Sequence, residues 1–150
     1  PADTKLQYRW YRNGKAAWAG TNSHFALNSG HLGARITVKV TARRDGYPTA
    51  TETSATLKIA KGTLSARPVL ITGTPSVGHK LKAKTGNWKP GWLIKYSYRW
   101  YRDGRPVAKA TAKSYQLKGK DSGHSISVRI TGRKVAYKTL TIASDPVRVS

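Results

Sequence analysis

Two tyrosines stand beside basic residues at matched places in the chain. Tyr11 lies two positions after Arg9, and Tyr101 lies two positions after Arg99. A phenol can give up an electron, whereas guanidinium groups attract anions. The pattern therefore indicates either a redox-active phenol that radicals reach from solvent or a platform that binds anions. The simpler interpretation is a solvated strand face on which tyrosine contributes β-propensity.

These tyrosines belong to an internal repeat. The sequence YRWYRNG at 8–14 returns as YRWYRDG at 98–104, and the same offset holds without a gap from Gln7 to the C-terminus. A constant offset of this length indicates two copies of one folded unit. We expect a first domain over residues 1–62, a linker over 63–67 and a second domain over 68–150.

The residue alternation predicts an all-β chain. Apolar residues at 36, 38 and 40 alternate with polar ones, as they do at 126, 128 and 130, and Asn-Gly or Asp-Gly supplies a tight turn after each repeated motif. Short strands without a helical period favour two tandem β-sandwiches. The chain contains no cysteine, so each core must be held by packing without disulfides. Trp10 and Trp100 are expected to be buried in these cores.

The two domains are not expected to be equal. The second has candidate leading strands at 68–72 and 79–85, and nothing equivalent precedes residues 7–12 in the first. The sequence leaves open whether the leading strands of the first domain were removed, whether it is a reduced sandwich, or whether another chain supplies them.

The alternation also predicts which side chains face outward. If Trp10 and Trp100 point inward, Tyr11 and Tyr101 point outward together with their neighbouring arginines. Lys39 and Arg129 should stand beside the tyrosines on the adjacent strand. We further expect a basic concave surface between the domains. The candidate anion-binding or cofactor-binding residues are Arg9, Lys39, Arg67, Lys95, Arg99 and Arg129.

Charge is the strongest compositional signal. Lys and Arg number 28 against 6 acidic residues, which gives a formal net charge of +22. Such a field attracts polyanions. No apolar run is long enough to span a bilayer, so we expect no membrane insertion. Cysteine and methionine, the residues most easily oxidised, are both absent. Together these features favour a secreted, extracellular protein in its mature form, and we expect a monomer.

Conventional catalytic motifs are missing. The sequence has no paired carboxylates, no Gly-x-Ser-x-Gly elbow and no phosphate-binding loop, which argues against a common hydrolase or transferase. The histidines lack the spacing and the cysteine partners of a zinc site, so surface histidines are the simpler interpretation. His31, His79 and His124 remain candidates for a single axial bond to a bound metal.

Three motifs carry a resemblance to a known family. Tyr-x-Trp-Tyr-Arg-Asn/Asp-Gly, Asp-x-Gly-x-x-Ile-x-Val at 121–128 and Thr-Gly/Ala-x-x-x-x-Tyr resemble the immunoglobulin-like repeats of secreted actinobacterial proteins. The first repeat departs from the pattern at His31, where the aspartate is missing. As a small, basic, cysteine-free tandem, the chain also resembles the secreted radical oxygenases of skin propionibacteria. That resemblance implies an antioxidant that quenches radicals, with a bound anionic cofactor. An anionic tetrapyrrole such as heme or a corrin would suit the positive charge of the chain. The resemblance assigns no catalytic residue.

Three functions follow from this sequence. The resemblance ranks first a secreted antioxidant that scavenges free radicals, with Tyr11 and Tyr101 as candidate donors and a cationic interdomain cleft for an anionic cofactor or small molecule. Second is a non-enzymatic module that binds anionic cell-wall or host polysaccharide. Third is a nucleic-acid binder, favoured by basic residues interleaved with aromatic ones but without a recognisable motif.

Overall fold

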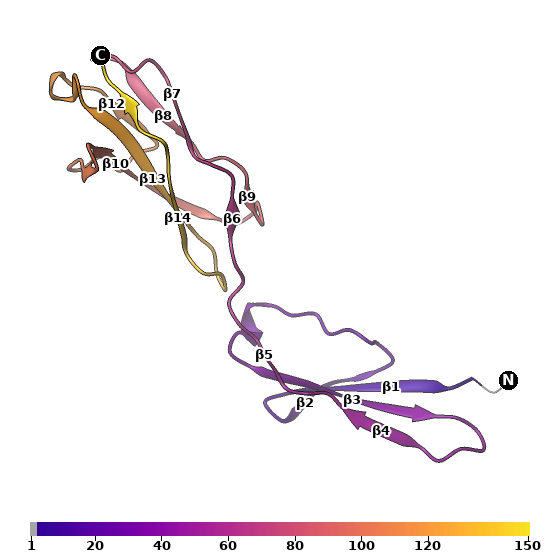
Figure 1. The fold of residues 1–150 in the computed structure, drawn as a ribbon. Helices are drawn as coiled ribbons and strands as arrows, with labels where there is room; N and C mark the ends of the chain where they lie inside the picture. The colour runs from indigo at the N-terminus through magenta and orange to yellow at the C-terminus, as the bar shows by residue number, and fades with distance from the viewer. Residues whose placement is uncertain (1–2) are drawn as a thin grey trace. The chain divides into compact units, whose positions relative to one another are not determined.

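The computed structural model describes residues 3–150 and divides the chain into two compact units, with unit 1 ending at Lys61 and unit 2 beginning at Gly62 (Figure 1). Nearly all regular structure is β. The helical segments described are two 3-10 turns of three residues each, so no candidate membrane-spanning helix is found in this part of the chain. Each unit is considered by itself below.

Unit 2 contains a five-stranded sheet that carries the second copy of the repeat. Its strand order is β11-β10-β13-β14, and β15 also pairs with β13. The tight turn between β10 and β11 has positive φ at Asp103 and Gly104, as the sequence predicts. The strands are β10 (Lys95–Arg102), β11 (Arg105–Pro106), β13 (Ser125–Arg133), β14 (Leu140–Ala143) and β15 (Val147–Arg148).

A second sheet of unit 2 packs on the first. Its order is β12-β8-β7, and β6 and β9 form a separate short pair. Apolar residues of β8 and β13 alternate with polar ones, and the buried sets meet in one core around Trp100, whose side chain is fully buried. The bounds are β6 (Ser65–Ala66), β7 (Leu70–Thr72), β8 (Lys80–Lys84), β9 (Trp88–Lys89), β12 (Ser114–Gln116) and the 3-10 turn η2 (Gly119–Asp121).

This arrangement is that of an immunoglobulin-like sandwich. One sheet matches strands C, F and G of such domains, the other matches A, B and E, and a Trp on strand C fills the centre. The indole N–H of Trp100 donates a hydrogen bond to the carbonyl of Ala112 at 2.9 Å, which satisfies its buried polar atom. The predicted fold class, all-β and immunoglobulin-like without disulfides, is confirmed.

Unit 1 is a reduced version of the same design. Its sheet has the order β2-β1-β3-β4 with β5 on β3, and the residues described in this unit form no second sheet. The register of β1 on β3 repeats that of β10 on β13, with Trp10 opposite Val38 as Trp100 is opposite Val128. The elements are β1 (Lys5–Arg12), β2 (Lys15–Gly20), η1 (Ser29–His31), β3 (Arg35–Arg43), β4 (Ala50–Thr53) and β5 (Leu57–Lys58).

The missing sheet corrects one expectation for unit 1. Trp10 is only half-buried, because no strands cover the face on which it lies. Residues 24–28, which include Phe25 and Leu27, have no regular structure. The matching strand in unit 2, β12, pairs with β8, and unit 1 has no counterpart of β8 among its described residues.

The segment expected to be a linker belongs to unit 2. Leu64 is buried in the core of this unit, and Ser65–Ala66 forms β6, which pairs with β9. Residues 63–67 therefore act as the first strand of the sandwich. Their polar and small composition suits an edge strand as well as a linker, so composition alone does not distinguish the two.

Candidate anion-binding faces

The outer face of β10 and β13 gathers basic side chains in unit 2. Trp100 and Val128 point into the core, so residues of opposite parity point outward. The antiparallel register places Lys95 opposite Arg133 and Arg99 opposite Arg129. Strands β10, β13 and β14 contain no acidic residue. We call the four cations and Tyr101 the outer face of unit 2.

Tyr101 is held within this face by a cation. The guanidinium carbon of Arg129 lies 4.5 Å from the centre of the Tyr101 ring, and Nη1 donates a hydrogen bond to the phenol oxygen at 3.3 Å. A cation over an aromatic face is attracted by the ring quadrupole. The expected neighbourhood of Tyr101 and Arg129 is therefore present, with the phenol half-exposed to solvent.

Hydroxyl groups complete the outer face of unit 2. Arg133 donates a hydrogen bond to Ser97 Oγ at 3.3 Å, and the hydroxyls of Thr131 and Thr141 are 2.8 Å apart. Guanidinium forks recognise carboxylate, sulfate or phosphate oxygens in a bidentate manner, while hydroxyls can donate or accept. The face is chemically suited to an anionic, oxygen-rich ligand.

Unit 1 carries a smaller version of this face. Arg9 is opposite Lys39 across β1 and β3, and both are exposed. They border a hollow of about 200 Å³, which Tyr11 and Thr41 also line. The structure thus brings Arg9, Tyr11 and Lys39 together, as the sequence predicts.

Arg67 is not part of either face. It follows β6, and its backbone N–H donates to the carbonyl of Asn87 at 3.0 Å. Lys95, Arg99 and Arg129 share the outer face of unit 2 without it. The concave surface expected between the units stays a prediction.

The three candidate histidines lie in separate places. His31 closes η1 by accepting a hydrogen bond at Nδ1 from the backbone N–H of Asn28, and its ring meets Phe25 edge-on. His124 Nδ1 is 2.5 Å from Asp103 Oδ2, and His79 is exposed just before β8. No group of three or more His, Asp or Glu side chains could hold a metal among residues 3–150.

His31 is the histidine whose surroundings best match a bound anionic ring. With Arg12 and Lys15 it lines an open hollow of about 680 Å³. Nε2 could serve as an axial ligand, and the two cations could meet carboxylates. The Nδ1 contact with Asn28 holds the ring against the 3-10 turn. This structural role alone explains a histidine at this position.

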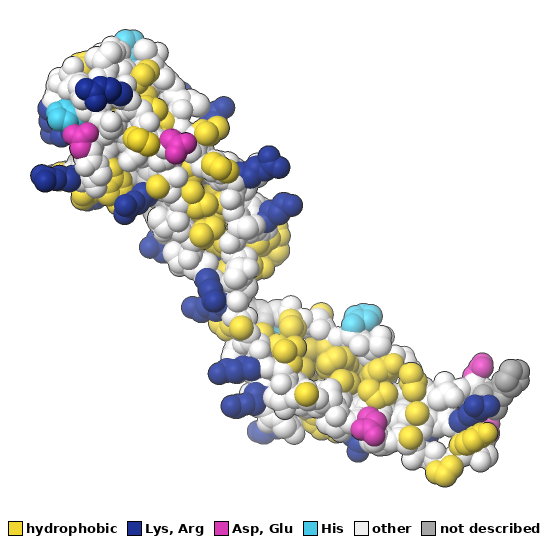
Figure 2. Space-filling model, viewed as in Figure 1, with side chains coloured by type: hydrophobic (Ala, Val, Ile, Leu, Met, Phe, Trp, Pro, Cys, Tyr) yellow, Lys and Arg dark blue, Asp and Glu magenta, His cyan; other side chains and the backbone are white. Residues whose placement is uncertain are grey.

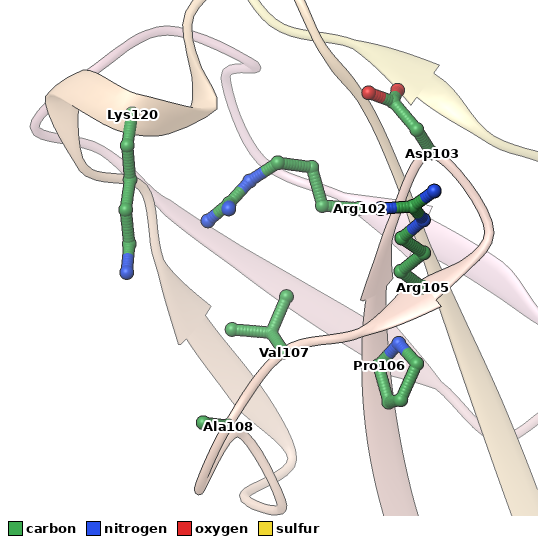
Figure 3. Close-up of a pocket in the computed structure, with 7 residues that line it drawn as sticks. All are labelled: Arg102, Asp103, Arg105, Pro106, Val107, Ala108 and Lys120. Carbon is green, nitrogen blue, oxygen red and sulfur yellow. The ribbon is translucent and has the colours of Figure 1, made fainter.

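A further basic hollow escaped the sequence analysis. It has a volume of about 530 Å³ and lies beside the β10–β11 turn. Figure 3 shows the Arg102 side chain extending across it toward Lys120. The signal in the sequence was the pair of arginines around the Asp-Gly turn. Its lining residues are Arg102, Asp103, Arg105, Pro106, Val107, Ala108 and Lys120.

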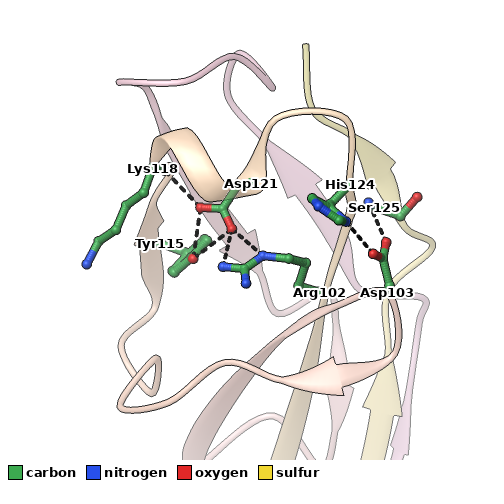
Figure 4. Close-up of polar contacts among 7 residues, drawn as sticks. All are labelled: Arg102, Asp103, Tyr115, Lys118, Asp121, His124 and Ser125. Carbon is green, nitrogen blue, oxygen red and sulfur yellow. Dashed lines mark hydrogen bonds and ion pairs between the residues drawn. The ribbon is translucent and has the colours of Figure 1, made fainter.

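Arg102 is engaged by a buried carboxylate rather than free for a ligand. Asp121 is fully buried and accepts hydrogen bonds from Arg102 Nε at 2.7 Å, the Tyr115 hydroxyl and the Lys118 backbone N–H (Figure 4). Burial alone would raise the pKa of Asp121. The backbone donor, Arg102 and Tyr115 together outweigh that effect and hold its pKa below the ordinary value.

A second carboxylate fixes the neighbouring turn. Asp103 Oδ1 accepts from the Ser125 backbone N–H at 2.9 Å, and Oδ2 meets His124 (Figure 4). These two contacts lower the pKa of Asp103. In unit 1 Asn13 Oδ1 accepts the matching bond from Arg35 N, also at 2.9 Å. Both networks thus serve the fold, which leaves the outer faces as the candidate site.

Comparison with known proteins adds little to this site. No protein-family model and no curated protein matches the chain. One similar solved structure is the amphioxus IgVJ-C2 molecule, at 12% identity and a TM-score of 0.37, over 100% of this chain and 91% of that one. The fold assignment rests on the strand order and burial described above.

Proposed function

We propose that this chain is an extracellular, non-enzymatic module that binds anionic polysaccharide through the outer faces of its sheets. The observation that carries the proposal is the acid-free outer face of unit 2, on which Lys95, Arg99, Arg129 and Arg133 stand together. Unit 1 repeats the arrangement on a smaller scale with Arg9 and Lys39. A polymer with regularly spaced anionic groups can contact such faces at several points.

Polysaccharide is favoured over nucleic acid by the chemistry of the face. Single-stranded nucleic acids are bound by exposed aromatic rings on which bases stack. One face of the Tyr101 ring is occupied by Arg129, whereas the hydroxyls of Ser97 and Thr131 suit the hydroxyl-rich edge of a sugar. Binding should weaken steeply as salt rises, because association releases condensed counterions.

The direct experiment is a titration of the full chain with a heparin fragment and with an uncharged dextran of equal length over a series of salt concentrations. We expect binding to heparin alone, with a linear fall of log affinity against log salt. Binding to dextran, or affinity for heparin that ignores salt, would refute the proposal. Stronger binding to a single-stranded oligonucleotide of equal charge would move the assignment to nucleic acid.

The contact between Arg129 and Tyr101 favours a second candidate, a secreted antioxidant. A radical that abstracts a hydrogen atom from the Tyr101 hydroxyl is reduced, and the residue becomes a neutral phenoxyl radical. The half-exposed phenol is accessible for this step. Sustained quenching then needs an external reductant or a redox cofactor, for which an anionic tetrapyrrole beside His31 is the arrangement to test.

A further inference from the structure

Two connections between strands of unit 2 expose large apolar side chains. The connection from β9 to β10 carries Trp92 and Leu93, which are 63% and 77% exposed, and the connection from β13 to β14 carries Val135, which is 79% exposed. None of the three belongs to the buried cluster of unit 2 or packs against it. The core is complete without them, so the fold does not explain why these residues are apolar.

The two connections lie side by side. Both leave the five-stranded sheet at the same end, because Lys95 begins β10 opposite Arg133, which ends β13. The ammonium group of Lys134 lies 3.6 Å from the centre of the Trp92 ring and donates a hydrogen bond to the Trp92 carbonyl at 3.0 Å. We call the following four residues the loop tip of unit 2: Trp92, Leu93, Lys134 and Val135.

The backbone holds the loop tip in a defined conformation. The N–H of Gly62 donates to the carbonyl of Ala136 at 2.9 Å, and the N–H of Lys138 donates to the carbonyl of Gly62 at 2.9 Å. Leu93 and Ala136 adopt positive φ angles of 55° and 63°. Leucine rarely adopts this region, and such strain concentrates at functional sites. The strained backbone of Leu93, together with its exposed side chain, favours a role outside the fold.

The surroundings of the loop tip are basic. The sequence has no acidic residue in 53–102 or in 122–144, the two segments that contain the loop tip, and Lys95, Arg133 and Lys138 lie close to it along the chain. In Figure 2 the half of unit 2 in which Figure 1 labels β6 and β14 shows hydrophobic and basic side chains on the visible face and no acidic one. Exposed apolar surface bordered by cations is complementary to a surface with negative charge above an apolar layer.

We propose that the loop tip docks unit 2 on the surface of a bilayer that contains anionic phospholipids. Leu93 and Val135 enter the boundary between headgroups and acyl chains, where burial of apolar surface is favourable. The Trp92 indole lies at the level of the headgroups, which tryptophan prefers. Lys134 and its basic neighbours contact the lipid phosphates, because an anionic membrane surface attracts cations. The docking is shallow and leaves both sheets outside the bilayer.

The lysine within the loop tip favours a lipid surface over a protein partner. The centres of protein–protein interfaces are depleted in lysine, because burial of an unpaired ammonium group is costly. At a bilayer the stem of Lys134 can lie along apolar surface while its ammonium group reaches the phosphates. An anionic polysaccharide would satisfy the cations, but it offers no apolar layer to Leu93 and Val135.

The test measures binding of the full chain to vesicles at near-physiological salt. Vesicles of equimolar phosphatidylcholine and phosphatidylglycerol are compared with vesicles of phosphatidylcholine alone by cosedimentation. We expect binding to the first kind and binding weaker by about tenfold or more to the second. Anionic vesicles with brominated acyl chains should quench tryptophan fluorescence, and Trp92→Phe should remove most of this quenching. No binding to anionic vesicles, or quenching that persists in Trp92→Phe, overturns the proposal.

Two matched variants separate the loop tip from the net charge. The first carries Leu93→Asn and Val135→Asn, and asparagine tolerates the positive φ of the first position. The second carries Leu70→Asn and Val77→Asn, which replace other exposed apolar residues of unit 2. The first variant should bind anionic vesicles more weakly by about tenfold or more, because it buries less apolar surface, while its heparin affinity stays unchanged. The second should bind both ligands as the unaltered chain does.

Three results with these variants would contradict the proposal. Equal affinity of the two variants for anionic vesicles would mean that binding follows net charge. An equal loss of heparin and vesicle affinity in the first variant would make the loop tip part of a polysaccharide site. A dimer of the unaltered chain that dissociates in the first variant, as measured by sedimentation, would mean that a second copy covers the loop tip.

Discussion

Arg129 lies over the ring of Tyr101 and donates a hydrogen bond to its hydroxyl. The contact joins the cationic surface of unit 2 to the phenol most suited to radical chemistry. The two proposed functions therefore meet at one place on the sheet. They can be separated, because substitutions can remove the phenol oxygen without removing charge.

Tyr101→Phe removes the hydroxyl and keeps the ring under Arg129. We expect heparin affinity to change by less than about fivefold, since one side-chain hydrogen bond contributes about 1 kcal/mol or less on an exposed surface. If the antioxidant proposal holds, the number of stable radicals quenched per chain should fall. The matched control is Tyr47→Phe, an exposed tyrosine that lies near Arg44. An equal fall in both variants contradicts a special role for Tyr101.

Asp121→Asn should destabilise unit 2 and leave unit 1 nearly unaffected. The substitution leaves Arg102 without its charge partner, and breaking a largely buried ion pair costs about 3–5 kcal/mol. Unit 1 has His31 at this position, so it does not contain the network. Urea unfolding followed by residue-resolved hydrogen exchange measures each unit separately. An equal loss of stability in both units would refute this account of Asp121.

The same carboxylate makes the stability of unit 2 depend on pH in acid. The pKa of Asp121 is lower in the folded than in the unfolded chain, where it is about 3.9. The stabilisation is therefore complete above the unfolded value and is lost as pH falls through the folded value. Unfolding free energies of unit 2 measured from pH 7 downward should decline below about pH 4. The decline should be smaller in Asp121→Asn, and an unchanged profile would contradict the assignment.

The two tryptophans of the repeat should differ in their contribution to stability. Trp100→Ala creates a cavity in a closed core and should cost about 3–5 kcal/mol. Trp10→Ala should cost clearly less, because its ring is already half-exposed on the uncovered inner side of the unit 1 sheet. Chemical denaturation of both variants measures the difference. Equal losses would mean that the inner face of unit 1 is covered in solution.

The sequence was sufficient to predict the fold where the evidence was local or repeated. Alternation and the Asn-Gly and Asp-Gly turns located β1, β3, β10 and β13, and parity placed Arg129 beside Tyr101. The sequence also indicated that the leading strands of the second domain have no equivalent ahead of residues 7–12. The consequence of this difference for Trp10 was missed, because burial depends on the opposing sheet and the motif around Trp10 is the same in both units.

Tertiary partners account for the other misses. Ser65–Ala66 became a strand only because β9 lies beside it. The hollow lined by Arg102 and Lys120 joins residues separated along the chain by two strands, so the arginines around the Asp-Gly turn indicate only one side of it. Arg67 directly follows β6, which pairs with β9, so it does not lie on β10 or β13 with the other candidate cations.

The central claim is that anion binding resides on the outer face of unit 2 and not in the net charge of +22. The decisive measurement compares heparin affinity for two variants that each lose four charges. One changes Lys95, Arg99, Arg129 and Arg133 to Gln; the other changes the exposed residues Lys80, Lys82, Lys84 and Lys113 to Gln. We predict that the first variant alone loses affinity by about tenfold or more, and that the slope of log affinity against log salt becomes shallower by about one for each contact removed. Equal losses in the two variants would contradict the claim, because binding would then follow total charge.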